Sequence, residues 1–236
     1  MMITPAQRFR RNLAVQQQLQ ANEALTPSPD SLHLQLRELE NDVSRLRSLV
    51  ARSERVDMKR DVLLPKWMPT VEQYLKGEKV FNNPPFMYCI IWLFDTGELG
   101  KALDWADIAI AQNQTTPENF KSNLPTFVAD TMLGWARDQF ASGNSIEPYF
   151  SRTLKNVAEQ WRLHEELKAK WMKFAGVYLL RDDAGKAVSP SGINDPERLK
   201  MADAYLAAAQ SLHRNSGVKS IRERIDARLR AMTKAQ

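Results

Sequence analysis

The chain has 236 residues, of which 43% are hydrophobic and 26% are charged, and its formal net charge is +5 with a pI near 9.3. This composition is that of an ordinary globular protein with one core, and the basic charge permits nucleic-acid contact without demonstrating it. No stretch approaches the ~18 apolar residues of a membrane span, and the first residues lack the apolar core of a signal peptide, so we expect a soluble intracellular protein without a membrane partner.

Residues 1–30 are predicted to form a flexible basic arm. Arg8, Arg10 and Arg11 follow Pro5, and the turn-forming run TPSPD precedes the first regular helix. Such an arm is either a solvated terminus or an element that reaches DNA phosphates.

Residues 31–64 are predicted to form one long helix that Pro65 closes. Its apolar residues alternate four and three apart, which is the spacing of a coiled-coil seam. A seam this narrow cannot bury itself, so we expect it to pack on a partner helix from this chain or from another copy. The predicted oligomerisation residues are Leu32, Leu36, Leu39, Val43, Leu46 and Val50.

Two helical segments carry a surplus of basic residues. The first runs from Arg45 to Lys66, and the second is the last helix, from Gly217 to about Met232. A run of charge is either a solvated helix face or a flank that follows DNA. The predicted DNA-binding residues, with those of the arm, are Arg8, Arg10, Arg11, Arg52, Arg55, Lys59, Arg60, Arg222, Arg224 and Arg228.

Residues 65–236 are predicted to form a globular helical domain. Pro65 and Pro69 should turn the chain out of the long helix, with Trp67 packed under that corner. The run FMYCIIWLF has the composition of a buried strand or helix, and we predict a helix because it ends at Asp95-Thr96-Gly97. The fold class is therefore all-α, a long heptad helix or coiled coil followed by a bundle of helical hairpins, with a weak likeness to tetratricopeptide units.

The search for catalytic chemistry finds no motif. His33, His164 and His213 lie far apart, no phosphate-binding loop or GxSxG is present, and Cys89 is expected to be a buried packing residue in a reducing cytoplasm. Carboxylate pairs that a magnesium-dependent nuclease could use have plainer roles as caps or exposed charges. We therefore predict no catalytic residue, metal site or cofactor. The candidate pairs are Asp95 with Glu98, Asp104 with Asp107, and Glu165 with Glu166.

Several segments together resemble one family, the small terminase subunit of peduovirus-type tailed phages, traditionally named the terminase endonuclease subunit. The segments are TPAQR, LLPKWMP, IIWLFDTGELGKALDWADIAI, NLPTFVAD and AYLAAAQSLHRNSGVKSIRERIDARL, and they cover roughly residues 4 to 230. LLPKWMP and WLFDTGELGKAL are the most specific of these.

The resemblance implies a phage or prophage protein of the bacterial cytoplasm. Such a subunit recognises the packaging site on double-stranded viral DNA as a ring-like homo-oligomer, and it recruits or regulates a large subunit that carries the ATPase. The family label also assigns endonuclease activity, which would require Mg²⁺, although no nuclease motif is present. The alternatives are an endonuclease acting through paired carboxylates and a helical-repeat adaptor that binds only protein.

Overall fold

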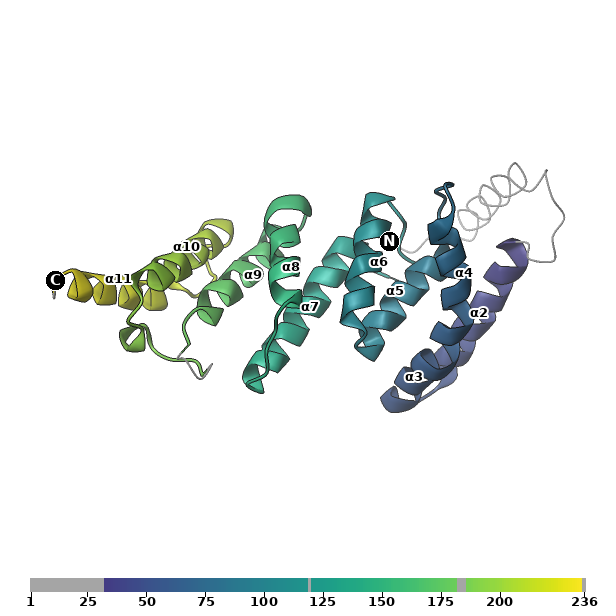
Figure 1. The fold of residues 1–236 in the computed structure, drawn as a ribbon, viewed down its shortest axis with the longest axis horizontal. Helices are drawn as coiled ribbons and strands as arrows, with labels where there is room; N and C mark the ends of the chain where they lie inside the picture. The colour runs from purple at the N-terminus through teal and green to yellow at the C-terminus, as the bar shows by residue number, and fades with distance from the viewer. Residues whose placement is uncertain (1–31, 119, 182–185, 235–236) are drawn as a thin grey trace. The chain divides into compact units, whose positions relative to one another are not determined.

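A computed structural model describes residues 32–118, 120–181 and 186–234 (Figure 1). Within these ranges the chain forms helices and no strand, apart from one isolated antiparallel bridge between Arg181 and Ala187. The predicted all-α class is confirmed, whereas its coiled-coil and tetratricopeptide details are not. The predicted arm, with Arg8, Arg10 and Arg11, and the side chain of Leu32 lie outside what the structure describes.

The helices follow one another along the chain, and the longest connections lie between α6 and α7 and between α9 and α10. The α-helices are α2 (Leu32–Ser48), α3 (Arg52–Met58), α4 (Leu64–Lys76), α5 (Pro84–Thr96), α6 (Leu99–Ala111), α7 (Leu124–Ala141), α8 (Tyr149–Lys155), α9 (Glu165–Tyr178), α10 (Pro196–Leu212) and α11 (Lys219–Lys234). Two π-helical turns, η1 (Lys59–Leu63) and η2 (Asn156–Gln160), continue α3 and α8, and a 3-10 turn, η3 (Pro190–Gly192), precedes α10.

The chain divides into two compact units. The first comprises Met1–Ala102 and Gln112–Pro117, and the second comprises Leu103–Ala111 and Glu118–Gln236. The boundary between the units therefore falls inside α6. The predicted division of the chain into an arm (1–30), a long-helix segment (31–64) and a globular helical domain (65–236) stays a prediction.

The prediction of one continuous helix over residues 31–64 is wrong at two points. Helix α2 ends at Ser48, and Ala51 has an extended backbone (φ −74°, ψ 137°) before α3 begins. The helical path also continues past Pro65, because the N–H of Leu64 donates to the carbonyl of Lys59, five residues back, in the π turn η1. Pro65 then occupies the first turn of α4, where a proline needs no N–H partner and its ring fits.

The apolar seam of α2 faces the interior of the first unit. Leu39, Val43 and Leu46 are buried, Leu36 is half-buried, and Val50 lies beyond the end of α2 with 91% of its surface exposed. The seam thus has a partner within the chain, which explains why so narrow an apolar stripe is stable. Its predicted role between copies stays a prediction.

Asp42 fixes α2 against α4. Its Oδ2 atom accepts hydrogen bonds from Lys66 Nζ at 2.7 Å and from Trp67 Nε1 at 2.9 Å, and Lys66 also contacts Glu38 at 2.7 Å. Trp67 is buried as predicted. Burial lowers the pKa of Lys66, but its hydrogen bonds to Asp42 and Glu38 outweigh burial and the pKa is raised overall. The sequence motif LLPKWMP is therefore the joint between these two helices.

Helix α5 is the central element of the first unit and is buried on nearly all sides. Asn83 caps it by accepting a hydrogen bond from the N–H of Phe86 at 3.0 Å, and Gly97 ends it in the left-handed region (φ 85°). Helices α2, α3 and α4 and the turn η1 all pack against it. A helix that is apolar on all sides must be buried in this way. The predicted helix over FMYCIIWLF and its end at Asp95-Thr96-Gly97 are confirmed.

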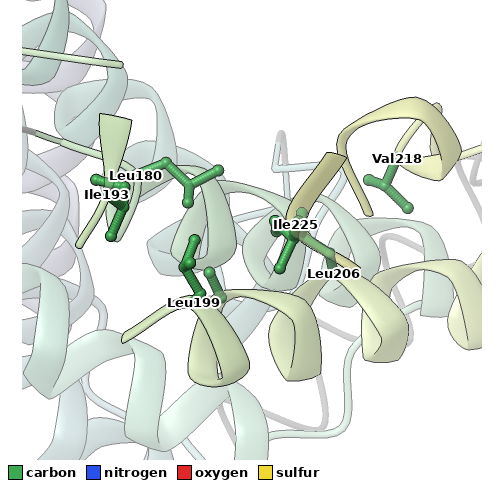
Figure 2. Close-up of a cluster of buried hydrophobic side chains, with 7 residues drawn as sticks. Leu180, Ile193, Leu199, Leu206, Val218 and Ile225 are labelled. Atoms are coloured by element: carbon green, nitrogen blue, oxygen red, sulfur yellow. The ribbon is translucent and has the colours of Figure 1, made fainter. Parts of the chain in front are cut away.

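The second unit contains a tight hairpin of α9 and α10. A Cβ atom at Gly176 in α9 would lie 2.7 Å from Leu206 Cγ and 2.9 Å from the carbonyl oxygen of Ala202, so only glycine lets the backbones approach this closely. The end of the hairpin packs with α11 around a buried apolar cluster (Figure 2). Its members are Leu180, Ile193, Leu199, Ala202, Leu206, Val218 and Ile225.

Asp42→Ala should lower the free energy of unfolding by about 1–3 kcal/mol, because the buried Nε1–H of Trp67 loses its acceptor. Glu38→Ala removes the more exposed carboxylate on the same lysine and should cost less than about 1 kcal/mol. Urea unfolding of both variants measures the difference. Equal losses would mean that the tryptophan hydrogen bond does not hold α2 to α4.

Gly176→Ala should destabilise the protein by about 1–3 kcal/mol, because the new methyl group meets backbone and a branched carbon of α10. Gly134→Ala in α7 is the matched control, since nothing lies within 4 Å of its Cβ position. That substitution should stabilise the protein by about 0.5–1 kcal/mol through helix propensity. Thermal unfolding of the two variants should therefore shift in opposite directions.

Candidate nucleic-acid interface

The predicted DNA-binding residues that the structure describes fall into two groups. In the first, Lys59, Arg60 and Arg222 contact carboxylates, and Arg228 donates to a carbonyl and an amide oxygen. The second group contacts no carboxylate among the described residues, and its members are Arg52, Arg55 and Arg224. Because a cation that is held by a carboxylate has its charge neutralised, the second group is the more available to phosphates.

Lys59 and Arg60 belong to the first group. Lys59 Nζ lies 2.7 Å from Asp95 Oδ2 with 14% of its side chain exposed, and it thereby ties η1 to the end of α5. Arg60 contacts Asp57 at 2.5 Å and Asp61 at 3.0 Å, and these hydrogen bonds, that to Asp61 foremost, raise its pKa. Both side chains therefore have acidic partners within the chain, Lys59 at a distance in the sequence and Arg60 among its neighbours.

Arg222 and Arg228 of α11 also have partners. The guanidinium of Arg222 donates to both carboxylate oxygens of Asp203, at 2.8 and 3.1 Å, and to Gln210 Oε1 at 2.9 Å. Arg228 donates to the carbonyl of Ile193 at 3.1 Å and to Asn194 Oδ1 at 2.7 Å. These two arginines fasten α11 to α10 and to the segment before it, and Arg224 between them is exposed without an ion pair among the described residues.

The connection between α2 and α3 holds the exposed group in the first unit. We name residues 45–55 the arginine corner; its four exposed arginines are Arg45, Arg47, Arg52 and Arg55. Within the described part of the chain none of the four makes an ion pair, and Arg55 alone has a side-chain hydrogen bond, to the carbonyl of Val50 at 3.3 Å. The segment contains one acid, Glu54, so its field is positive.

The sequence prediction selects Arg52 and Arg55 but not Arg45 and Arg47, which form the last turn of α2. A sequence signal for the C-terminal end of α2 could have identified them. No such signal is apparent, because the heptad pattern continues to Val50, beyond the last residue of the helix. Cations in this position also interact favourably with the helix dipole, so they stabilise α2 with or without DNA.

In each carboxylate pair considered for catalysis at least one member contacts a cation of the chain; among the described residues only the pair of Asp104 and Asp107 has both members held in this way. In the second unit Arg152 contacts Asp104 at 2.6 Å and Asp107 at 2.7 Å, and Asn156 Nδ2 donates to Asp107 at 3.0 Å. Burial lowers the pKa of Arg152, but its hydrogen bonds to Asp107 and Asp104 outweigh burial and raise it overall. This arrangement joins α6 to α8 and gives both carboxylates a counter-charge.

The other two pairs are arranged similarly. Asp95 contacts Lys59, and Glu166 contacts Lys170 at 2.7 Å in an exposed pair one helical turn apart. Over residues 32–118, 120–181 and 186–234, no group of three or more His, Cys, Asp or Glu side chains is arranged to hold a metal ion. Nor does this part of the chain contain a helix that is both long and apolar enough to cross a bilayer.

Cys89 is a fully buried side chain of α5. Burial raises the pKa of its thiol to about 12, against a smaller opposing effect of the charge on Lys101. The thiol is therefore neutral and unreactive at physiological pH, in agreement with a packing role.

The chain matches the family described as phage small terminase subunit over residues 36–166, which include the arginine corner and the joint between α2 and α4. It is 45% identical over 197 residues to a protein of Haemophilus phage HP1 (strain HP1c1) named "Probable terminase, endonuclease subunit", a match that covers 84% of this chain and 70% of that protein. No solved structure matches.

The chain therefore belongs to the phage small terminase subunit family. A second relative, the "Terminase, endonuclease subunit" of Escherichia phage P2, is 25% identical over 235 residues, which is 100% of this chain and 89% of that protein.

Native Cys89 should resist a thiol-labelling disulfide reagent at about pH 8 and react only after unfolding in urea, because the reagent requires an accessible thiolate. An unfolded thiol ionises at about 8.5, whereas this one ionises at about 12 when folded. Ionisation of the Cys89 thiol therefore lowers the free energy of unfolding only as the pH rises from about 8.5 to about 12. Rapid labelling of the folded protein would contradict the buried position.

Proposed function

We propose that this protein is the small subunit of a phage or prophage terminase that binds double-stranded viral DNA at the packaging site. In this role it recruits or regulates a large subunit carrying the ATPase, so that the DNA is cleaved and packaged into capsids. The activity belongs to the cytoplasm of the bacterial host. Membership of the small terminase family supports this proposal. The DNA-binding part of it is carried by the arginine corner, whose four arginines make no ion pair among the described residues.

The corner suits phosphate binding because guanidinium groups can bind phosphate oxygens through two parallel hydrogen bonds. Arg47 and Arg52 lie on either side of the three residues that separate α2 from α3, so both ends of the corner carry charge. Arg224 in the second unit is a further candidate contact. The predicted contacts of Arg8, Arg10 and Arg11 remain part of the proposal.

A ring-like homo-oligomer completes the proposal. A few arginines per chain bind DNA weakly, whereas several copies on one duplex combine their contacts and raise the overall affinity. Light scattering should give a mass well above that of a dimer, and a stable monomer would contradict this part. Since Leu39, Val43 and Leu46 are buried within the first unit, the interface between copies requires surface beyond those three residues.

The second candidate function is the endonuclease named in the two relatives. Its chemistry would need Mg²⁺ held by carboxylates, and the pairs described above would have to release Arg152, Lys59 or Lys170 first. Incubating the isolated protein with packaging-site DNA and Mg²⁺ distinguishes the two. Cutting that is lost in Asp104→Asn with Asp107→Asn would establish the endonuclease, whereas binding without cutting supports the recognition subunit. A protein-only adaptor would retain no DNA even at low salt.

The double variant Arg47→Gln with Arg52→Gln should weaken duplex binding and reduce the slope of log K against log salt by about 2, because each lost phosphate contact releases about one counterion fewer. Arg60→Gln is the matched control, because Arg60 is already held by Asp57 and Asp61. This substitution should leave the salt slope unchanged. Fluorescence anisotropy across a salt series measures both. Equal effects of the two variants would contradict the assignment of the corner.

A further inference from the structure

Val50 lies at the tip of the arginine corner with 91% of its surface exposed. It is the most exposed large apolar side chain in the described ranges; the next is Val80, at 60%. Single exposed apolar residues are ordinary on protein surfaces. What distinguishes Val50 is its position in the three residues where the helical path is broken, between four arginines that make no ion pair with any residue the structure describes.

The backbone around Val50 is held on both sides. Arg55 donates from its guanidinium to the carbonyl of Val50 at 3.3 Å and from its backbone N–H to the carbonyl of Ala51 at 3.2 Å. On the α2 side, the hydroxyl of Ser48 donates to the carbonyl of Arg45 at 2.7 Å, and Leu46 is buried one turn before the tip. The valine is thus presented on a fixed bend, so little conformational entropy is lost when it binds.

We propose that Val50 is an apolar wedge that enters the minor groove of duplex DNA at a base step, while the arginines beside it bind the flanking phosphates. This inference rests on the proposed DNA-binding function and deepens it by naming how the corner engages the duplex. Proteins that insert an apolar side chain between base pairs unstack that step and bend the DNA toward the major groove. The arginines then gain phosphate contacts from the bend, which offsets the cost of unstacking.

The same geometry predicts which DNA is preferred. Pyrimidine–purine steps such as TA are flexible and are kinked or unstacked most easily. A wedge whose neighbouring arginines bind phosphates should therefore favour a duplex with such a step at the point of insertion. Valine cannot hydrogen-bond to a base, so the preference would come from deformability and not from direct readout.

The charge of the corner favours DNA over the other possible occupants of this surface. A second copy of the same corner would bring like charges together around the valine, which is unfavourable. An acidic segment of the large subunit would satisfy the arginines but would produce no bend in DNA. The experiment below separates these occupants.

The test uses the full chain and a short duplex with a donor and an acceptor dye at its ends, in one version with central TA steps and in another with a G·C centre. Val50→Ser should abolish the protein-induced rise in energy transfer and weaken binding to the TA duplex by about tenfold, because the apolar surface of an inserted valine is no longer removed from water. Binding should remain salt-dependent because the arginines are unaltered, although the slope loses the phosphate contacts that the bend supplies. Val80→Ser, on the connection between α4 and α5, is the matched control and should behave as the unaltered protein.

The outcomes of this test distinguish the proposed wedge from the proposed DNA-binding function on which it rests. Normal bending by Val50→Ser, with salt-dependent binding intact, would overturn the wedge and leave the proposed function standing. Failure of the unaltered protein to bind either duplex at low salt would overturn the proposed function itself. A change in oligomer mass in Val50→Ser with bending intact would assign the valine to an interface between copies and also overturn the wedge. An unchanged thermal unfolding midpoint in Val50→Ser establishes that its fold is intact.

Discussion

The first unit depends on the pairing of Asp42 with the side chains of Lys66 and Trp67. One carboxylate oxygen accepts both hydrogen bonds, and the tryptophan that donates the second is buried. Because this joint holds α2 on α4, the apolar seam of α2 faces inward and its basic residues remain on the surface. The apolar seam, which the sequence alone suggests could pack on another copy, is thus packed within the chain. The arginine corner between α2 and α3 remains exposed and positively charged.

The structural role of each basic residue depends on the side chains that it contacts. Lys59, Arg152 and Arg222 each contact at least one carboxylate and join neighbouring helices, so their charge is used in holding the fold. Such contacts contribute more than an ordinary surface pair where the side chains are partly buried and bind through two atoms. The arginine corner has no comparable partner in the described residues. A basic stretch of sequence is thus composed of two kinds of residue: those whose charge is used within the fold, and those whose charge has no carboxylate partner among the described residues.

The relatives named as endonuclease subunits raise the question of what the acidic residues do in this chain. Asp104 and Asp107 share Arg152, and their geometry favours a fixed joint between α6 and α8 over a mobile metal site. Carboxylates that bind a catalytic metal are normally held by donors that leave their oxygens free toward the ion. Here the oxygens point to a guanidinium, so in this structure the charge of both carboxylates is neutralised within the chain.

The sequence by itself determined the all-α class, the helix from Asn83 to Gly97 and the buried positions of Trp67 and Cys89, because caps, glycine stops and apolar runs are local signals. The resemblance to the small terminase family was also evident from the sequence alone. Only the tertiary structure decided where the long helix breaks, that Leu39, Val43 and Leu46 are buried within the first unit, and that Lys59, Arg222 and Arg228 have partners. The physical reason is that ion pairs and burial join residues distant in sequence, as Lys59 is joined to Asp95, and no local pattern records them.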